Sequence, residues 1–190
     1  MKSIMQSHTA SRLDRFLTCF AGLAIVSAVI AVASGPIARA RAAALANYQV
    51  GDEFAPVAGL DFSQSPATTV AFISTKCGPC QESGDTFRLL TSMPRNFQVA
   101  VVGYEEVEAL RGFVEKFAIR ADLVSNVPTG SIRFSGVPKI AVLDRRGVIR
   151  SIWSGSDQIQ ASLPDILASL QGLERDDATR RDLGLRGRRR

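Results

Sequence analysis

The sequence has few of the residues that form metal sites and catalytic triads. One of its 190 residues is histidine and three are cysteine. The histidine is His8, and Cys19 lies inside a long apolar run, so that only Cys77 and Cys80 remain in residues 35–190. A closed zinc site needs four ligands, typically Cys or His. We therefore expect no metal site, no Cys–His catalysis and no histidine-ligated copper or haem within one chain.

The sequence also lacks a basic face, although its formal net charge is +5. The excess of Lys and Arg lies near the two ends, and residues 35–171 carry equal numbers of basic and acidic side chains. A nucleic-acid-binding domain needs a basic patch on its folded part. We therefore expect no nucleic-acid partner.

Charge is absent altogether from residues 16–34, which follow a basic segment at 1–15. The run is about the ~20 residues that span a bilayer, and longer than the apolar part of most cleaved signals. An Ala-Arg-Ala site at 38–40 nevertheless permits cleavage. We expect either a single-pass inner-membrane anchor with the domain facing the periplasm or outside, or an export signal that leaves a secreted or periplasmic protein. Residues 35–49 read as a linker.

A globular domain is predicted over residues 50–171. Two short apolar runs rich in β-formers, at 69–74 and 97–102, are typical of buried central strands. The segment between them, roughly 78–93, has the periodicity of a helix. Strand, helix and strand in this order predict a βαβ unit.

A second helix is predicted over roughly 105–118, where Val107, Leu110, Val114 and Phe117 recur at helical spacing. Its charged residues, Glu105 among them, fall on the polar face. Residues 119–135 show no pattern that assigns an element.

The remaining sequence is predicted to form a β-hairpin, a helix and a tail. Apolar runs at 139–143 and 148–153 flank a glycine-containing turn and read as antiparallel strands. A helix is expected within 157–171, where Pro164 marks its start or a kink. Residues 172–190 are rich in arginine and lack a core-forming pattern, which predicts a disordered tail, with contact to acidic lipid headgroups or a partner as the alternative.

The Cys77-Gly78-Pro79-Cys80 stretch follows the first predicted strand. A disulfide between these cysteines closes a very short loop and would stabilise little, so a structural role is disfavoured. Cys77 stands at a helix start, where free N–H groups and the helix dipole favour a thiolate, and Pro79 suits a first turn. Gly78 adds backbone freedom, and Lys76 adds positive charge. We expect Cys77 to attack a disulfide and Cys80 to resolve the product, with no cofactor beyond this redox pair.

With these motifs, residues 48–171 resemble the thioredoxin superfamily, specifically its exported, membrane-tethered thiol-disulfide oxidoreductases of the TlpA/ResA type. The stretches that carry the resemblance are VGDEFAPVAGLDF, VAFISTKCGPCQES and FSGVPKIAVLDRRGVIRSIWSG. The resemblance implies an α/β fold with a mixed sheet flanked by helices. It also implies a cis bond between Val137 and Pro138, beside which a substrate segment pairs with the Val137 backbone. Reduction of disulfides in exported proteins, with electrons from a membrane thiol donor, is the implied function.

Several features depart from that family pattern. Lys76 replaces the Trp that often precedes the first cysteine, and Lys139 replaces the Thr that often follows the cis-proline. No acid lies in the strand before Cys77 to accept the proton of Cys80, and Glu82 is the substitute that the sequence offers. These differences bear on reduction potential and substrate preference.

Three alternative functions stay open on the sequence. The stretch LDRRGVIRS and the helix after Cys80 also resemble MauD-like accessory factors, which help disulfide-rich partners to mature. Ser74 three residues before Cys77 faintly resembles a peroxidatic motif and leaves a thiol peroxidase possible. The third alternative is a non-enzymatic docking module in which the cysteines have no chemical role.

Overall fold

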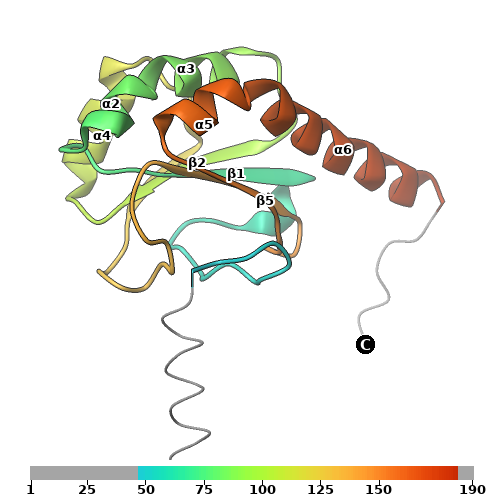
Figure 1. Ribbon diagram of the computed structural model, residues 1–190. Helices are drawn as coiled ribbons and strands as arrows, with labels where there is room; N and C mark the ends of the chain where they lie inside the picture. The colour runs from blue at the N-terminus through green and yellow to red at the C-terminus, as the bar shows by residue number, and fades with distance from the viewer. Residues whose placement is uncertain (1–46, 184–190) are drawn as a thin grey trace, which may run out of the picture. The chain divides into compact units, whose positions relative to one another are not determined.

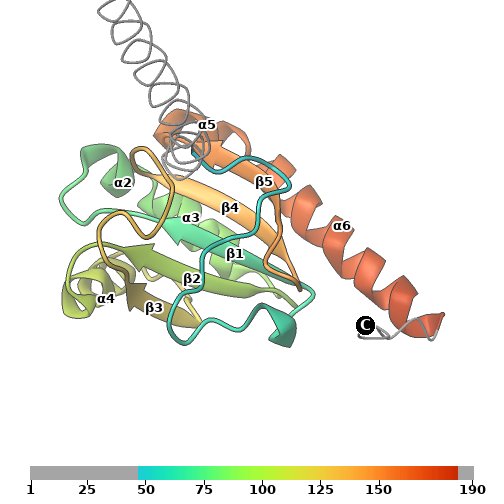
Figure 2. The same cartoon turned by 90° about the horizontal axis from the view of Figure 1, so that it is seen from below.

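The computed structural model describes residues 47–183. This part of the chain contains a five-stranded mixed sheet. Its strand order is β3-β2-β1-β4-β5, as Figure 2 shows face-on. β1, β2 and β3 run parallel, whereas β4 is antiparallel to both β1 and β5. The strands are β1 (Ala67–Phe72), β2 (Gln98–Gly103), β3 (Leu123–Asn126), β4 (Lys139–Asp144) and β5 (Ile149–Ser154).

The central strand β1 is buried along its whole length. Its Val70 is paired with Ala100 of β2 on one side and with Ala141 of β4 on the other. A strand that is covered on both faces has no exposed side on which polar residues would alternate with apolar ones. This explains the continuous apolar run in the sequence. β1 is the middle strand of the sheet, and residues 73–76 connect its end to Cys77.

The helices cover one face of this sheet, above it in Figure 1. Their apolar residues share a single buried cluster with one face of the strands, including Phe87, Leu110, Ile159 and Leu170. The helices are α2 (Gly78–Glu82), α3 (Gly84–Ser92), α4 (Val107–Lys116), α5 (Ser156–Ala161) and α6 (Leu163–Asp182).

Irregular chain covers the opposite face of the sheet, below it in Figure 1. Residues 47–66, which include the 3-10 helix η1 (Phe62–Gln64), cross this face, and the loop that leads into β4 packs beside them. The rings of Tyr48 and Phe54 stack with centroids 5.1 Å apart, and Phe134 packs against both. The segment before β1 is therefore part of the core.

Most of the predicted elements are present, with shifted bounds. The two central strands, the hairpin and the start of the last helix near Pro164 are confirmed. The helix predicted over 78–93 is divided into α2 and α3 at Ser83, and the helix predicted from 105 begins at Val107. The unassigned residues 119–135 contain the edge strand β3.

The prediction of a disordered tail from residue 172 is wrong as far as Asp182, because α6 continues to that residue. Apolar packing ends near Leu170 and Leu173, and charged contacts take over beyond them. Asp177 pairs with Arg145 of the β4–β5 turn at 2.9 Å and with Arg181 one turn further along the helix. A search for apolar periodicity does not detect a helix that is held by ion pairs.

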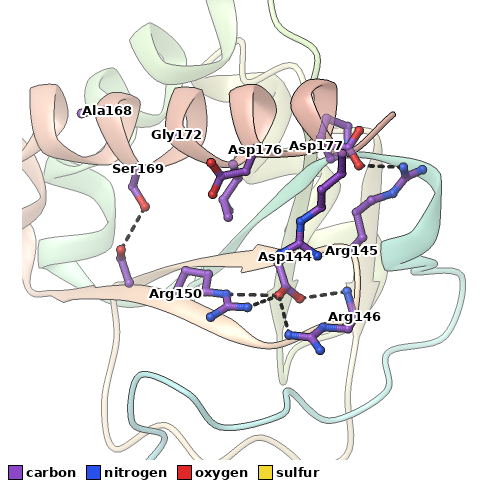
Figure 3. A pocket seen from close by; sticks show the side chains of 13 residues that line it. Asp144, Arg145, Arg146, Arg150, Ala168, Ser169, Gly172, Asp176 and Asp177 are labelled. Atoms are coloured by element: carbon purple, nitrogen blue, oxygen red, sulfur yellow. Dashed lines mark hydrogen bonds and ion pairs between the residues drawn. The ribbon is translucent and has the colours of Figure 1, made fainter. Parts of the chain in front are cut away.

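A cavity of about 440 Å³ lies between α6 and the β4–β5 hairpin. Figure 3 shows the two elements facing each other across it, with Asp177 bonded to Arg145, and Asp144 bonded to Arg146 and Arg150. Several of its charged groups are thus paired with each other. Neither Cys77 nor Cys80 lines this cavity.

The predicted anchor at 16–34 and most of the linker at 35–49 lie outside the described residues. Within residues 47–183, no helix is both long enough and apolar enough to cross a bilayer.

Candidate active site

The cysteine pair lies where the chain leaves β1 and enters α2. Cys77 is the N-cap of α2, and its sulfur accepts a hydrogen bond from the backbone N–H of Cys80 at 3.3 Å. The side chain of Cys77 is half-buried, whereas Cys80 is fully buried. Free N–H groups at a helix start stabilise a thiolate at the N-cap. The arrangement therefore presents one accessible sulfur with a second sulfur behind it.

The buried thiol holds its proton strongly. Burial raises the pKa of Cys80 to about 12, and its hydrogen bond with Cys77 acts in the same direction. The backbone N–H of Ser74, which donates to the Cys80 sulfur at 3.5 Å, opposes this by favouring the thiolate. At neutral pH Cys80 is thus a thiol, and it reacts as a nucleophile only once its proton has left.

A third segment, which lies sixty residues further along the chain, is next to the cysteine pair in the structure. The Val137–Pro138 peptide bond is cis, as the family resemblance implies. The thiol of Cys77 donates to the carbonyl oxygen of Val137 at 3.7 Å. Pro138 is buried at the start of β4, which pairs with β1, so the sheet itself brings this bend beside the cysteines.

Lys139 follows this bend and is partly buried. Its ammonium group donates to the hydroxyl of Ser154 at 2.8 Å and lies 5.7 Å from the ring centre of Phe134. Burial lowers the pKa of Lys139, because the charged form loses hydration. Lys139 thus places an amino group next to the proline, where the proteins that the sequence resembles commonly have a hydroxyl.

The other predicted site residues are placed as follows. Gly78 and Pro79 form the exposed first turn of α2. Lys76 precedes Cys77 and is exposed. Glu82 is exposed as well, and its carboxylate accepts from the hydroxyl of Ser156 on α5 at 3.2 Å.

Sequence reasoning missed Glu105, which follows β2. Its carboxylate accepts hydrogen bonds from the Ser74 hydroxyl at 2.5 Å and from the Thr75 backbone N–H at 3.1 Å. It was expected on the polar face of a helix, yet it lies before α4 and turns toward the cysteine loop. One signal could have found it: the carboxyl ends of neighbouring parallel strands meet at one edge of a sheet, which places Glu105 beside the end of β1.

These features define a thioredoxin fold: a mixed sheet, a C-x-x-C pair between a central strand and a helix, and a cis-proline before the antiparallel strand. No family model matches the sequence, and no curated protein matches it. Among solved structures, it is similar to a candidate protein disulfide isomerase from Bacteroides thetaiotaomicron, with 16% identity, 65% of this chain and 91% of that one covered, and a TM-score of 0.50. It is also similar to a candidate thioredoxin from Neisseria meningitidis, with 16% identity, 63% and 92% covered, and a TM-score of 0.50. At such identities the likeness shows the shared fold.

Proposed function

We propose that this protein is a thiol-disulfide oxidoreductase that reduces disulfides in exported protein partners. One observation carries the proposal: the half-buried Cys77 sulfur caps a helix, with the Cys80 thiol behind it and the Val137 carbonyl 3.7 Å away. A reactive thiol, a resolving thiol and a backbone edge for a peptide are the parts that disulfide exchange with a protein needs.

The proposed cycle has two exchange steps. The Cys77 thiolate attacks a substrate disulfide, so that a bond forms between Cys77 and one substrate sulfur while the other sulfur leaves and takes a proton. Cys80 then loses its proton and attacks the Cys77 sulfur. The Cys77–Cys80 disulfide forms, the second substrate sulfur leaves as a thiol, and two electrons have passed to the substrate.

The substrate is expected to bind as an extended segment along the Val137–Pro138 bend. Val137 lies between the cysteine loop and β4, and its carbonyl already faces Cys77. Lys139 adds a positive charge beside this bend, which favours substrates with acidic residues next to their cysteine.

The place and direction of the reaction are further parts of the proposal. The uncharged run at 16–34 supports a domain that is tethered to the inner membrane or exported. The family resemblance supports reduction over oxidation. Each turnover leaves the cysteine pair oxidised, so a donor must return two electrons, and the family resemblance implies a membrane thiol donor.

Trapping of the mixed disulfide tests the proposal. In a Cys80→Ala variant the bond between Cys77 and its substrate cannot be resolved, so covalent complexes with exported proteins are expected on non-reducing gels and should disappear on reduction. The control is the Cys77→Ser, Cys80→Ala double variant, which should trap nothing. Equal yields of complex from both variants, or none from either, would contradict the proposal.

A further inference from the structure

The loop that leads into the Val137–Pro138 bend is held by the first residues that the structure describes. The backbone N–H of Tyr48 donates a hydrogen bond to the carbonyl oxygen of Arg133 at 3.1 Å, and the Ser135 N–H donates to the side-chain oxygen of Asn47 at 2.6 Å. Asn47 and Ser135 are 88 residues apart along the chain. The N-terminal segment thus fixes the backbone of this loop two residues before Val137.

Side chains add to these backbone contacts. The Arg133 guanidinium lies 4.4 Å from the ring centre of Tyr48 and pairs with Asp52 at 3.4 Å. The Phe134 ring packs edge-on against the Tyr48 ring, with centroids 5.2 Å apart. Tyr48 is itself held in place, because it is buried and its hydroxyl accepts from the Ala55 N–H at 2.9 Å. Tyr48 is therefore a buried anchor for two residues of the loop.

A second contact holds the same loop from the sheet. The Tyr104 hydroxyl donates to the carbonyl oxygen of Ile132 at 3.1 Å, and the Tyr104 ring packs against Phe72 of β1 with centroids 5.0 Å apart. Ile132 and the three residues after it are thus each bonded or packed. Gly136 comes next, is exposed and has a φ of 89°, in the left-handed region that favours glycine. It alone separates the held part of the loop from Val137.

An ordered loop bears on substrate binding more than on thiol chemistry. An extended segment that pairs with the Val137 backbone binds less tightly when the loop has to be ordered on binding, because the lost conformational entropy opposes association. The contacts of Asn47 and Tyr48 order the loop in advance. The helix start that stabilises the Cys77 thiolate belongs to α2 and is formed without them.

We infer that Asn47, next to the anchor Tyr48, is a positioning residue for substrate binding: it holds the loop that presents Val137 to an extended segment of a protein substrate. The inference rests on the proposed function. The end of the predicted linker thus has a second role, since it also covers the apolar face of the sheet. Asn47 takes no part in the bonds that form and break.

The test compares a protein disulfide with a small one, in the full chain with Cys19→Ser. Insulin, with excess dithiothreitol as the electron source, reports the binding of a polypeptide. Dithionitrobenzoate has no peptide backbone to pair with Val137 and reports the reactivity of Cys77. Asn47→Ala should raise KM for insulin about threefold to tenfold, the range that the loss of one hydrogen bond predicts. It should change kcat and the rate with dithionitrobenzoate by less than about twofold.

Two variants of the same segment are the controls. Asn47→Asp keeps an oxygen that accepts from the loop, and its KM should stay within about twofold of the parent value. Gln49→Ala removes a similar amide, which bonds at 3.5 Å to the Asn47 carbonyl oxygen and not to the loop, and it should leave KM unchanged. If Asn47→Ala lowers the melting temperature so far that the kinetics are affected, Tyr104→Phe replaces it. This variant removes the bond to Ile132, keeps the aromatic ring, and should raise KM in the same way.

The outcomes separate this inference from the proposed function. An unchanged KM in Asn47→Ala, or in Tyr104→Phe where that variant is needed, overturns the inference and leaves the exchange cycle standing. An equal rise in Gln49→Ala, or an equal loss of rate with both disulfides, does the same. If the parent chain does not reduce insulin, the proposed function fails, and this inference fails with it.

Discussion

The cysteine loop and the α6–hairpin region differ in how charge is arranged. At the cysteine loop one carboxylate is buried with an oxygen that lacks a partner among the described residues, and its charge acts on a buried thiol. At α6 several carboxylates and guanidinium groups satisfy one another around the cavity of about 440 Å³. The charged groups at α6 are thus paired with one another, whereas the proposed site holds a carboxylate oxygen that has no partner among the described residues.

The largest expected difference between the two regions is in activity. Cys77→Ser removes the attacking sulfur and should lower the rate of disulfide reduction by more than about 100-fold, since a hydroxyl cannot form the mixed disulfide. Asp177→Asn, in the α6 region, should change that rate by less than about twofold. An insulin-reduction assay on both variants measures the contrast, and a large loss in Asp177→Asn would break it.

The next effect is on stability and should appear at α6. Leu170 is fully buried in the cluster between the helices and the sheet. Leu170→Ala should reduce the free energy of unfolding by about 2–5 kcal/mol, because it leaves a cavity under α6. Denaturant unfolding followed by circular dichroism measures it. The exchange rate per folded molecule should be unchanged, and a matched loss of rate would show that the two regions are coupled.

The smallest effect concerns the response of the hairpin to acid. Although burial acts to raise the pKa of Asp144, hydrogen bonds from Arg150 and from the N–H groups of Arg146 and Val148 outweigh it and lower that pKa. A lowered folded pKa contributes stability that is present above the unfolded value of about 4 and is lost as the pH falls through the folded value.

Asp144→Asn should therefore cost about 1–2 kcal/mol at pH near 6, and the cost should shrink as the pH falls below the unfolded value of about 4. Unfolding midpoints of both proteins across this pH range provide the measurement. A difference that stays constant with pH would mean that the loss comes from geometry rather than from charge.

Much of the scaffold could be predicted because its signals are local. The apolar runs of β1 and β2, the glycine turn of the hairpin and the C-x-x-C pair each occupy a few adjacent residues. The edge strand β3 escaped prediction because it is short and partly exposed, which leaves little hydrophobic pattern. The end of α6 escaped because its contacts are ion pairs with a turn some thirty residues earlier.

The candidate site could be predicted in part. Cys77 and Cys80 stand out by spacing, and Pro138 by the family resemblance. Glu105 was not singled out, because in the sequence it is one of several acids at the start of a helical pattern. Its neighbour Ser74 lies 31 residues away along the chain, so only the pairing of β1 with β2 brings them together.

The sequence by itself determined the alternation of strands and helices and the pair of cysteines at a helix start, because apolar periodicity and helix capping act within a few residues. Only the tertiary structure decided what surrounds that pair. The Val137 carbonyl and the Glu105 carboxylate come from opposite sides of β1. The first contacts Cys77 and the second bonds to Ser74 and Thr75, because strand pairing brings residues that are distant along the chain together.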